Sequence, residues 1–350
     1  MRKYCIAEKS RENHAGSKAR NDAAKILESH GYLPVYMHFS QDKGGADKIK
    51  MAFFTLRDWK RLEKRTKSGD WLVIQYPLAM YPKISLLAVS FIRKMKKKKV
   101  KLLLLIHDLE SLRGLKFRHE KIFLELADEV IVHNQRMQDY LENCGYRFKH
   151  VYRLGLFDYL AEPSQEKRLR EKNTIAFAGN LKQDKCGFLN ELSGVLGDLS
   201  LHLYGPNYSG AESRRLVFCG EYPPEALPQV MSEGWGLVWD GASAGECSGT
   251  YGQYLKYNNP HKLSLYLASG MPVILWKKAA AAPMIVDKKL GITVDSLEQL
   301  PGILKKITDE EYREILKNVE ETGKRLRKGF YLGDVIGRIE RNDEKDRAGK

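Results

Sequence analysis

The 350-residue sequence has few cysteines and no long apolar run. Its five cysteines stand singly, without a C-x-x-C pair, which argues against a disulfide framework and a zinc site. No apolar stretch approaches the roughly 18 residues that a membrane-spanning helix needs. The N-terminus, MRKYCIAEKS, lacks the apolar core and cleavage site of a secretory signal. We therefore expect a cytoplasmic protein.

Acidic residues are outnumbered by basic ones. The chain has 59 Lys and Arg against 44 Asp and Glu, for a formal net charge of +15. This charge implies an anionic partner, which could be a phosphorylated small molecule, a nucleic acid or an acidic membrane surface. A nucleic-acid-binding protein should show basic clusters interleaved with aromatic residues on a recognisable module, and the sequence shows none. We expect no nucleic-acid partner and keep such a protein as the alternative from another class.

Short apolar runs alternate with helical patterns in two successive series. Such alternation is typical of βα units and a mostly parallel sheet. The first series has runs at 4–7, 33–38, 71–77, 101–108 and 129–134, and the second at 174–180, 201–205, 215–220, 235–241 and 272–276. The pattern predicts an α/β protein with two doubly wound, Rossmann-like domains facing a cleft.

A charged stretch at 162–173 separates the two series and is the expected linker. We expect an N-terminal Rossmann-like domain at 1–160, on the acceptor side, and a C-terminal nucleotide-sugar-binding domain at 174–328. Residues 329–350 are expected to form a C-terminal tail that packs back on the first domain.

The stretch NNPHKLSLYLASGMPVI, residues 258–274, predicts a short helix followed by a buried strand. Asn259 is a suitable N-cap and Pro260 suits the first helical position. Lys262 in the first turn is unfavourable beside the positive end of the helix dipole, by a few tenths to about 1 kcal/mol. An anion over this turn would reverse the sign of that effect. Alternatively, Lys262 extends into solvent, and these residues alone do not decide between the two interpretations.

The order of several motifs resembles a known family. FAGN, LHLYG, FCGEYPPEALPQV and the stretch that ends in ASGMPV resemble the nucleotide-binding domain of glycosyltransferases with the two-Rossmann GT-B fold. Together with AGSKARND, IHDLESLR and VHNQRM, they resemble one group of small bacterial transferases. That group includes the glucosyltransferases that extend O-linked N-acetylglucosamine on serine-rich adhesins, and β-1,6-galactofuranosyltransferases. The resemblance covers most of the chain, roughly from Tyr4 to beyond Leu300.

The resemblance implies a UDP-sugar donor as co-substrate, no other cofactor, and a glycan or glycosylated-protein acceptor. It also implies a possible homo-oligomer. The E-x7-E pattern of many retaining GT-B enzymes is absent around the 258–274 stretch, and the resembling group is understood as inverting. We therefore expect a hexosyltransferase that moves glucose or galactofuranose. A nucleotide-sugar epimerase of the same architecture is the alternative within enzymes.

Departure of a nucleoside diphosphate requires a metal or fixed cations to neutralise its charge. No D-x-D motif is present, and the nearest pattern, at 108–110, is D-x-E. We therefore expect no metal site and assign the phosphates to Lys262, His261 and the helix N-terminus, with Lys182 as a second cation. An inverting transferase also needs a general base, for which Asp108 is favoured, with His107 beside it. Alternatively, Asp108 caps the next helix and His107 is structural.

Other candidate residues come from the ends of strands and from the first βα loop. The resemblance places Gly16 and Ser17 near the sugar and acceptor, although a capping role for Ser17 is the more economical interpretation. Tyr204 could stack on or line the uracil, and ordinary turn chemistry is the alternative for it and for Asn180. The nucleotide-sugar-binding candidates are Gly16, Ser17, Pro77, Asn180, Lys182, Tyr204, Asn259, His261 and Lys262.

A basic run follows the apolar segment ISLLAVSFI. Polybasic segments gain on the order of 1 kcal/mol per charge near anionic lipid, which suggests peripheral contact with the inner face of the membrane. The alternative is a solvated basic helix face. The residues concerned are Arg93, Lys94, Lys96, Lys97, Lys98 and Lys99.

Overall fold

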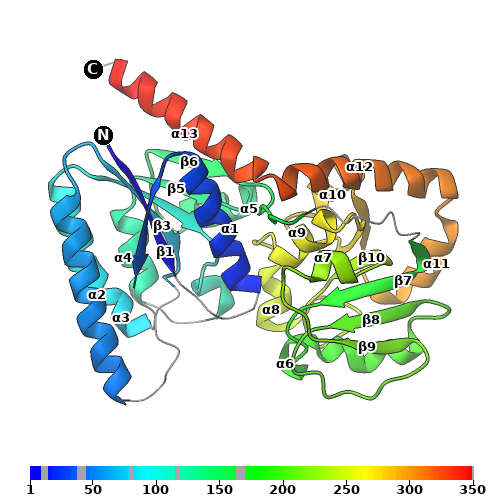
Figure 1. Ribbon diagram of the computed structural model, residues 1–350. Coiled ribbons are helices and arrows are strands. Elements are labelled where there is room, and N and C mark those ends of the chain that lie inside the picture. Colours follow the sequence, from blue (N-terminus) through cyan, green and yellow to red (C-terminus); the bar gives the residue numbers. More distant parts are fainter. Residues whose placement is uncertain (9–14, 38–44, 79–81, 115–117, 163–169, 349–350) are drawn as a thin grey trace. The chain divides into compact units, whose positions relative to one another are not determined.

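The computed structural model describes residues 1–8, 15–37, 45–78, 82–114, 118–162 and 170–348 (Figure 1). Contacts divide the chain into two compact units. Unit 1 comprises Met1–Glu12, Arg20–Leu154 and Leu332–Lys350, and unit 2 comprises Asn13–Ala19 and Gly155–Tyr331. Most of the expected linker, residues 163–169, lies outside the described residues.

Unit 1 is built on a six-stranded parallel sheet in the order β2-β1-β3-β4-β5-β6. Its strands are β1 (Lys3–Glu8), β2 (Leu33–Met37), β3 (Trp71–Tyr76), β4 (Lys101–Ile106), β5 (Glu129–Val132) and β6 (His150–Arg153). The central strand β3 is buried along its whole length, as a parallel strand covered on both faces should be. The helical elements are α1 (Ala15–Ser29), α2 (Gly45–Arg65), α3 (Pro82–Lys97), η1 (Ser111–Arg113), α4 (Arg118–Leu126), α5 (Gln135–Asn143) and α13 (Phe330–Ala348).

Unit 2 has a second six-stranded parallel sheet, in the order β12-β11-β10-β7-β8-β9. Its strands are β7 (Glu171–Ala178), β8 (Ser200–Tyr204), β9 (Leu216–Gly220), β10 (Glu233–Val238), β11 (Val273–Trp276) and β12 (Gly291–Val294). Its helices are α6 (Gln183–Cys186), α7 (Leu227–Val230), α8 (Gly249–Tyr254), α9 (His261–Ala268), α10 (Ala282–Asp287), α11 (Leu300–Lys306) and α12 (Asp309–Arg327), with η2 (Gly187–Gly194) and η3 (Leu297–Gln299) as 3₁₀ turns.

Both sheets are doubly wound, which confirms the predicted fold class. The chain reverses its direction of strand addition between β1 and β3 in unit 1, and between β7 and β10 in unit 2. In open α/β sheets, ligands bind at the carboxyl ends of the strands that flank such a switch point. The topology therefore directs attention to the residues that follow β7 and β10. No described helix has both the length and the apolar character needed to span a bilayer.

One close contact packs helix α9 against the sheet of unit 2. A Cβ atom on Gly236 in β10 would lie 2.2 Å from Cγ of Tyr266, so only glycine leaves room for the tyrosine ring. The Tyr266 hydroxyl then accepts a 2.7 Å hydrogen bond from the backbone N–H of Ala178, at the end of β7. This bond fixes α9 against the two strands that flank the switch point.

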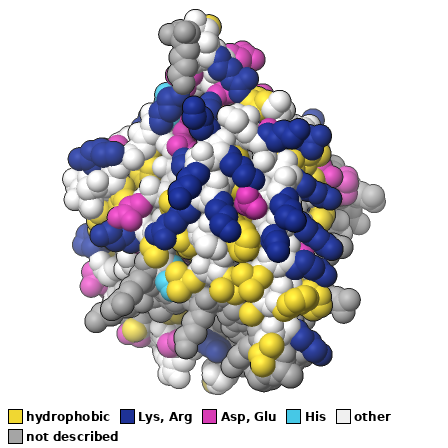
Figure 2. Space-filling view, turned by 90° about the vertical axis from the view of Figure 1, so that its left-hand side faces the viewer, with side chains coloured by type: hydrophobic (Ala, Val, Ile, Leu, Met, Phe, Trp, Pro, Cys, Tyr) yellow, Lys and Arg dark blue, Asp and Glu magenta, His cyan; other side chains and the backbone are white. Residues whose placement is uncertain are grey.

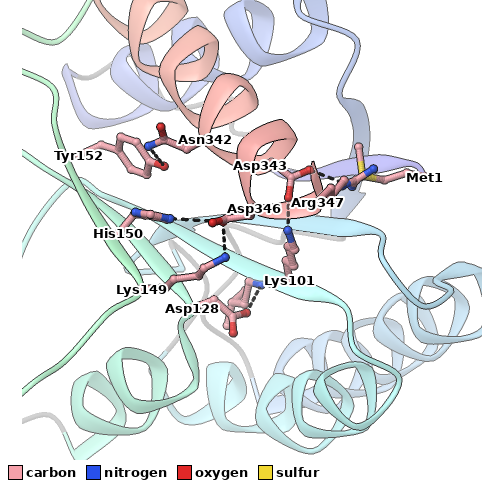
Figure 3. Close-up of polar contacts among 11 residues, drawn as sticks. Met1, Lys101, Asp128, Lys149, His150, Tyr152, Asn342, Asp343, Asp346 and Arg347 are labelled. Carbon is pink, nitrogen blue, oxygen red and sulfur yellow. Dashed lines mark hydrogen bonds and ion pairs between the residues drawn. The ribbon is translucent and has the colours of Figure 1, made fainter. Parts of the chain in front are cut away.

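Helix α13 pairs three acidic side chains with three lysines of unit 1. Figure 3 shows two of these pairs, Lys101 with Asp343 and Lys149 with Asp346. The acids recur every three residues on the helix, while the lysines begin or immediately precede separate parallel strands. Asp343 also accepts from Arg347 at 2.8 Å, and Asp346 is 3.4 Å from His150. The three ion pairs are Lys3 with Glu340, Lys101 with Asp343, and Lys149 with Asp346.

Replacement of Asp343 by Asn should lower the free energy of unfolding. Its side chain is buried, and its loss would leave Lys101 without its carboxylate partner. Because Lys101 is itself partly exposed, we expect a loss of about 1–3 kcal/mol. The neighbouring exposed Glu344 provides a control, and Glu344→Gln should change the free energy little. Urea unfolding of the two variants measures the difference, and equal stability would contradict a structural role for this pair.

Replacement of Tyr266 by Phe should destabilise unit 2. The variant keeps the ring over Gly236 but removes the acceptor of a buried backbone N–H, which costs about 1–3 kcal/mol. Tyr251→Phe removes a hydroxyl from an exposed tyrosine and is the matched control. Thermal unfolding of both variants checks the expectation. A midpoint for Tyr266→Phe equal to that of the control would show that the hydroxyl does not hold α9.

Candidate functional site

The loops after β7 and β8 approach each other closely. A Cβ atom on Gly205 would lie 2.0 Å from the carbonyl oxygen of Gly179, so this approach requires glycine. The Asn180 side chain accepts hydrogen bonds from the backbone N–H of Lys182 at 3.2 Å and from the Asn207 amide at 3.0 Å. Asn180 therefore shapes the turn, while the Lys182 side chain is exposed at the start of α6.

Lys262 forms a buried ion pair at the end of β10. Its Nζ lies 2.9 Å from Oδ1 of Asp240 and 3.2 Å from the carbonyl oxygen of Trp239. The same atom lies 4.5 Å from the centre of the Phe177 ring. The two charged side chains are only 11% and 8% exposed. The alternative that Lys262 extends into solvent is therefore wrong, because a carboxylate and a strand end hold it inside the unit.

Helix α9 begins one residue later than the sequence suggested. Pro260 is its N-cap residue and makes no side-chain cap hydrogen bond, and the first turn contains no acid. The prediction that Asn259 caps the helix is wrong, because its side-chain amide donates to the carbonyl oxygen of Gly155. In α9 the Leu263 N–H donates to the carbonyl oxygen of Pro260 at 2.9 Å, and helix geometry gives the N–H groups of His261 and Lys262 no acceptor within the helix. The start of α9 thus retains the features of an anion site.

His261 is neutral near pH 7. Its ring stacks on Tyr159, with centroids 5.0 Å apart, and its Nε2 atom is shielded from solvent without a hydrogen-bond partner. Burial, and to a smaller extent the charge of Lys18, lower the pKa of His261 to about 3. Of the two polar residues that open α9, only Lys262 therefore brings a positive charge to the helix N-terminus.

The first turn of α1 belongs to unit 2, because its residues pack against that unit. The Lys18 ammonium donates to the carbonyl oxygen of Leu160 at 2.6 Å and lies 4.9 Å from the centre of the Tyr159 ring. Because the same ring stacks on His261, the first turn of α1, which contains Gly16, and the start of α9 converge within this unit. Gly16 thus lies in the helix and not in the first βα loop, where it was expected from the sequence. Ser17 is buried, and it lies within α1, two residues after the first residue of the helix. The alternative that Ser17 is the N-cap residue is therefore wrong.

In unit 1, His107 and Asp108 follow β4, as the sequence indicates. Gln75 in β3 donates from Nε2 to the carbonyl oxygens of Ile6 and Arg20, so its Oε1 faces His107. His107 Nε2 lies 2.8 Å from this oxygen and donates to it. The contact fixes the orientation of the His107 ring at the carboxyl edge of the sheet.

The Asp108 carboxylate accepts from Arg113 Nη1 at 3.2 Å and is 36% exposed, so solvent reaches it. It does not cap η1, because the N-cap residue there is Glu110. The nearby Pro77 contributes its carbonyl oxygen to the Arg20 guanidinium. Asp108 therefore lies accessible at a strand end, without the capping role that was its alternative.

Tyr204 does not offer an exposed ring. Its hydroxyl donates to the buried carboxylate of Glu233, which also receives a 2.9 Å hydrogen bond from His202. Burial is the largest cause that raises the pKa of this tyrosine. A base can stack only on an accessible ring face, so Tyr204 is not part of the proposed donor site. Its hydroxyl and Glu233 form part of the interior of unit 2.

Sequence reasoning missed Asp240 and Gln75. Asp240 directly follows the buried run WGLVW, and Asp108 follows LLLLI after a single intervening residue, so a search for acids at strand ends would have found Asp240. Gln75 gives no such signal, because it lies inside a buried strand whose pairing depends on the fold. Among the described residues, no group of three or more His, Cys, Asp or Glu is arranged to hold a metal ion.

Solved structures share this fold. The lipopolysaccharide outer core galactosyltransferase WaaB, in its apo form, aligns with a TM-score of 0.59 at 14% identity, covering 97% of this chain and 99% of that one. An alpha-glucosyltransferase (AGT) in complex with UDP aligns with a TM-score of 0.55 at 12% identity, covering 91% and 95%. These likenesses confirm the two-Rossmann GT-B architecture.

Sequence comparison gives the family. Models of the N-terminal and C-terminal domains described as "Glucosyltransferase 3-like" match residues 3–154 and 175–339. The beta-1,6-galactofuranosyltransferase WbbI of Escherichia coli (strain K12) is 31% identical over 93% of this chain and 94% of its own length. Glucosyltransferase 3 of Streptococcus gordonii is 27% identical over 71% of this chain and 73% of its own. With both domains matched in order and the fold shared, the chain belongs to the glucosyltransferase 3-like family of GT-B glycosyltransferases.

Proposed function

We propose that this glycosyltransferase moves a hexose from a UDP-sugar to a hydroxyl group of a glycan or glycosylated-protein acceptor, with inversion at the anomeric carbon. The observation that carries the proposal is the Lys262–Asp240 ion pair at the start of α9, beside the switch point of the second sheet. Family membership and a solved neighbour in complex with UDP support the choice of donor.

The start of α9 suits a diphosphate. An ammonium group has three N–H donors, and the contacts to Trp239 and Asp240 use two of them in Lys262. The third can donate to a phosphate oxygen, together with the backbone N–H groups of His261 and Lys262 and the positive end of the helix dipole. Asp240 keeps the lysine in place, and its second oxygen can accept from a hydroxyl group of the donor.

These fixed charges also suit the chemical step without a metal ion. The acceptor oxygen attacks the anomeric carbon, the bond from that carbon to the phosphate oxygen breaks, and UDP leaves with the electron pair. Negative charge therefore grows on the diphosphate, where preorganised donors stabilise it more than the ground state. Lys262, the α9 N-terminus and the exposed Lys182 are the donors that we assign to this task.

Asp108 is the proposed general base. Its carboxylate is accessible at the end of β4 and would take the proton of the acceptor hydroxyl as the new bond forms. His107 is held by Gln75 next to it and would position the acceptor or the base. The sugar itself is proposed from the relatives. UDP-galactofuranose comes first because the galactofuranosyltransferase relative is more similar than the glucosyltransferases, and UDP-glucose comes second.

A transfer assay with UDP-galactofuranose, UDP-glucose and UDP-galactose tests the proposed donor. We expect transfer to a glycan acceptor, with UDP released in equal amount, from the first or second donor. Interconversion of sugars without an acceptor would instead indicate an epimerase. Failure of all three donors both to react and to stabilise the protein would contradict the proposal.

Replacement of Lys262 by Met should weaken UDP binding at least tenfold, because a hydrogen bond to a charged group contributes about 1.5–3 kcal/mol. The double variant Asp240→Asn, Lys262→Met removes both charges, so it leaves no unpaired carboxylate and should still bind UDP weakly. Lys277→Ala, at an exposed ion pair, is the control. Isothermal titration with UDP measures the three affinities. Wild-type affinity in the double variant would remove Lys262 from the donor site.

Replacement of Asp108 by Asn should leave UDP binding unchanged and slow transfer about 10²-fold or more, the usual contribution of a general base. Asp139→Asn changes an exposed carboxylate of the same unit and is the control. Initial rates at saturating donor, compared with UDP titration, separate chemistry from binding. A rate close to that of the control would exclude Asp108 as the base.

A further inference from the structure

Helices α2 and α3 pack side by side in unit 1 and expose apolar and basic side chains on their outer face. Figure 2 looks onto this side of the molecule. Lys and Arg side chains cover much of the upper part of the view, a band of hydrophobic side chains lies below them, and acidic side chains are few. We define the α2–α3 face by its described residues Ile49, Phe53, Leu56, Lys60, Lys64, Leu86, Arg93 and Lys97.

On α2 the exposed residues follow one stripe. Ile49, Phe53 and Leu56 are separated by four and three residues, so they share a helix face. Ile49 is 75% exposed and Phe53 is 63% exposed, unlike the opposite face, where Met51 and Trp59 are buried. Several large apolar side chains that lie next to one another, are this exposed and are bordered by polar groups indicate an interaction surface.

On both helices the exposed side chains change from apolar to basic toward the C-terminal end. On α2 the stripe continues through the exposed residues Lys60 and Lys64, and on α3 the exposed residues run from Leu86 to Arg93 and Lys97. Both helices run from the carboxyl end of one parallel strand toward the start of the next, so they point the same way. Their apolar ends therefore lie at one edge of the face and their basic ends at the other.

Acidic side chains do not offset this charge. Residues 49–67 contain seven Lys and Arg but two acids, and residues 86–100 contain six Lys and Arg and no acid. Asp58 is buried against Arg57 at 3.1 Å, and Glu63 pairs with Lys98 at 2.5 Å. Both acids are thus already neutralised by neighbours, and the outer surface keeps a strong positive charge.

The structure also shows which lysines of the basic run 93–99 are available to an anionic partner. Lys98 pairs with Glu63, and Lys96 pairs with Asp128, so neither presents a free ammonium. The apolar segment before the run is partly interior, because Ala88, Val89 and Ile92 are buried and only Leu86 among the large apolar residues at 86–92 is exposed. The apolar part of the surface comes mainly from α2 instead, which the sequence run alone did not indicate.

We propose that the α2–α3 face binds the surface of an anionic lipid bilayer. Its basic end lies against negatively charged headgroups, while Ile49, Phe53 and Leu56 enter the boundary between headgroups and acyl chains. An acidic protein or a nucleic acid would match the charge but would not require the adjoining row of exposed apolar side chains. This binding is independent of the sugar that the enzyme transfers. The helix starts, and hence the apolar band, lie toward the same sheet edge as Asp108.

Vesicle flotation tests the proposal with the full chain. The wild type should bind vesicles of 30% phosphatidylglycerol in phosphatidylcholine at 100 mM salt, and binding should fall steeply at 500 mM salt and with phosphatidylcholine alone. Arg93→Gln with Lys97→Gln should weaken binding at least about tenfold, since each basic residue contributes about fivefold. Lys305→Gln with Lys306→Gln, on the exposed surface of unit 2, makes the same charge change and should have little effect.

A second pair of variants tests the apolar band. Ile49→Ser with Phe53→Ser keeps the charge and should also weaken vesicle binding about tenfold or more. The tryptophan emission of the Phe53→Trp variant should shift to shorter wavelength when anionic vesicles are added. Equal binding by the α2–α3 variants and the unit 2 control, or no response of the Phe53→Trp reporter, would overturn the proposal. So would binding of a labelled DNA or RNA duplex through Arg93 and Lys97 without vesicle binding.

Discussion

The seating of α9 on the second sheet is the contact on which the candidate donor site depends. Tyr266 occupies the space that Gly236 leaves open, and its hydroxyl takes the backbone N–H at the end of β7. This arrangement brings the start of α9 to the carboxyl edge of the sheet, where Asp240 receives Lys262. A larger residue at position 236 would displace the helix and separate these charges, because the clash involves a packed ring and not a flexible side-chain end.

The Lys262–Asp240 pair explains how a cation is kept at the positive end of a helix dipole. Alone, a lysine there costs up to about 1 kcal/mol, and burial would add a desolvation penalty. The carboxylate, the carbonyl oxygen of Trp239 and the face of Phe177 together compensate these costs. The lysine can thus be oriented before any ligand arrives, which is the condition for effective electrostatic stabilisation of a leaving group.

The two units use their strand ends differently. In unit 2, glycines and a turn-forming asparagine let backbone segments approach closely, as at Gly179 and Gly205, which suits a site built from N–H groups. In unit 1, the edge carries side chains that can exchange or position protons, with His107 oriented by Gln75 and Asp108 accessible beside Arg113. This division matches the needs of a transferase, which must hold a charged leaving group and activate a hydroxyl.

The sequence by itself determined the fold class, the family and the polar residues at the strand ends, because hydrophobic periodicity and motif order are local properties that survive without coordinates. It also marked Lys262 as unusual. Only the tertiary structure decided that Asp240 is its partner, that His261 is neutral, that Tyr204 faces the interior, and that Asn259 bonds to Gly155 instead of capping a helix. These outcomes depend on residues far apart in the chain, and their burial and pairing are set by how strands and helices pack, which no local pattern encodes.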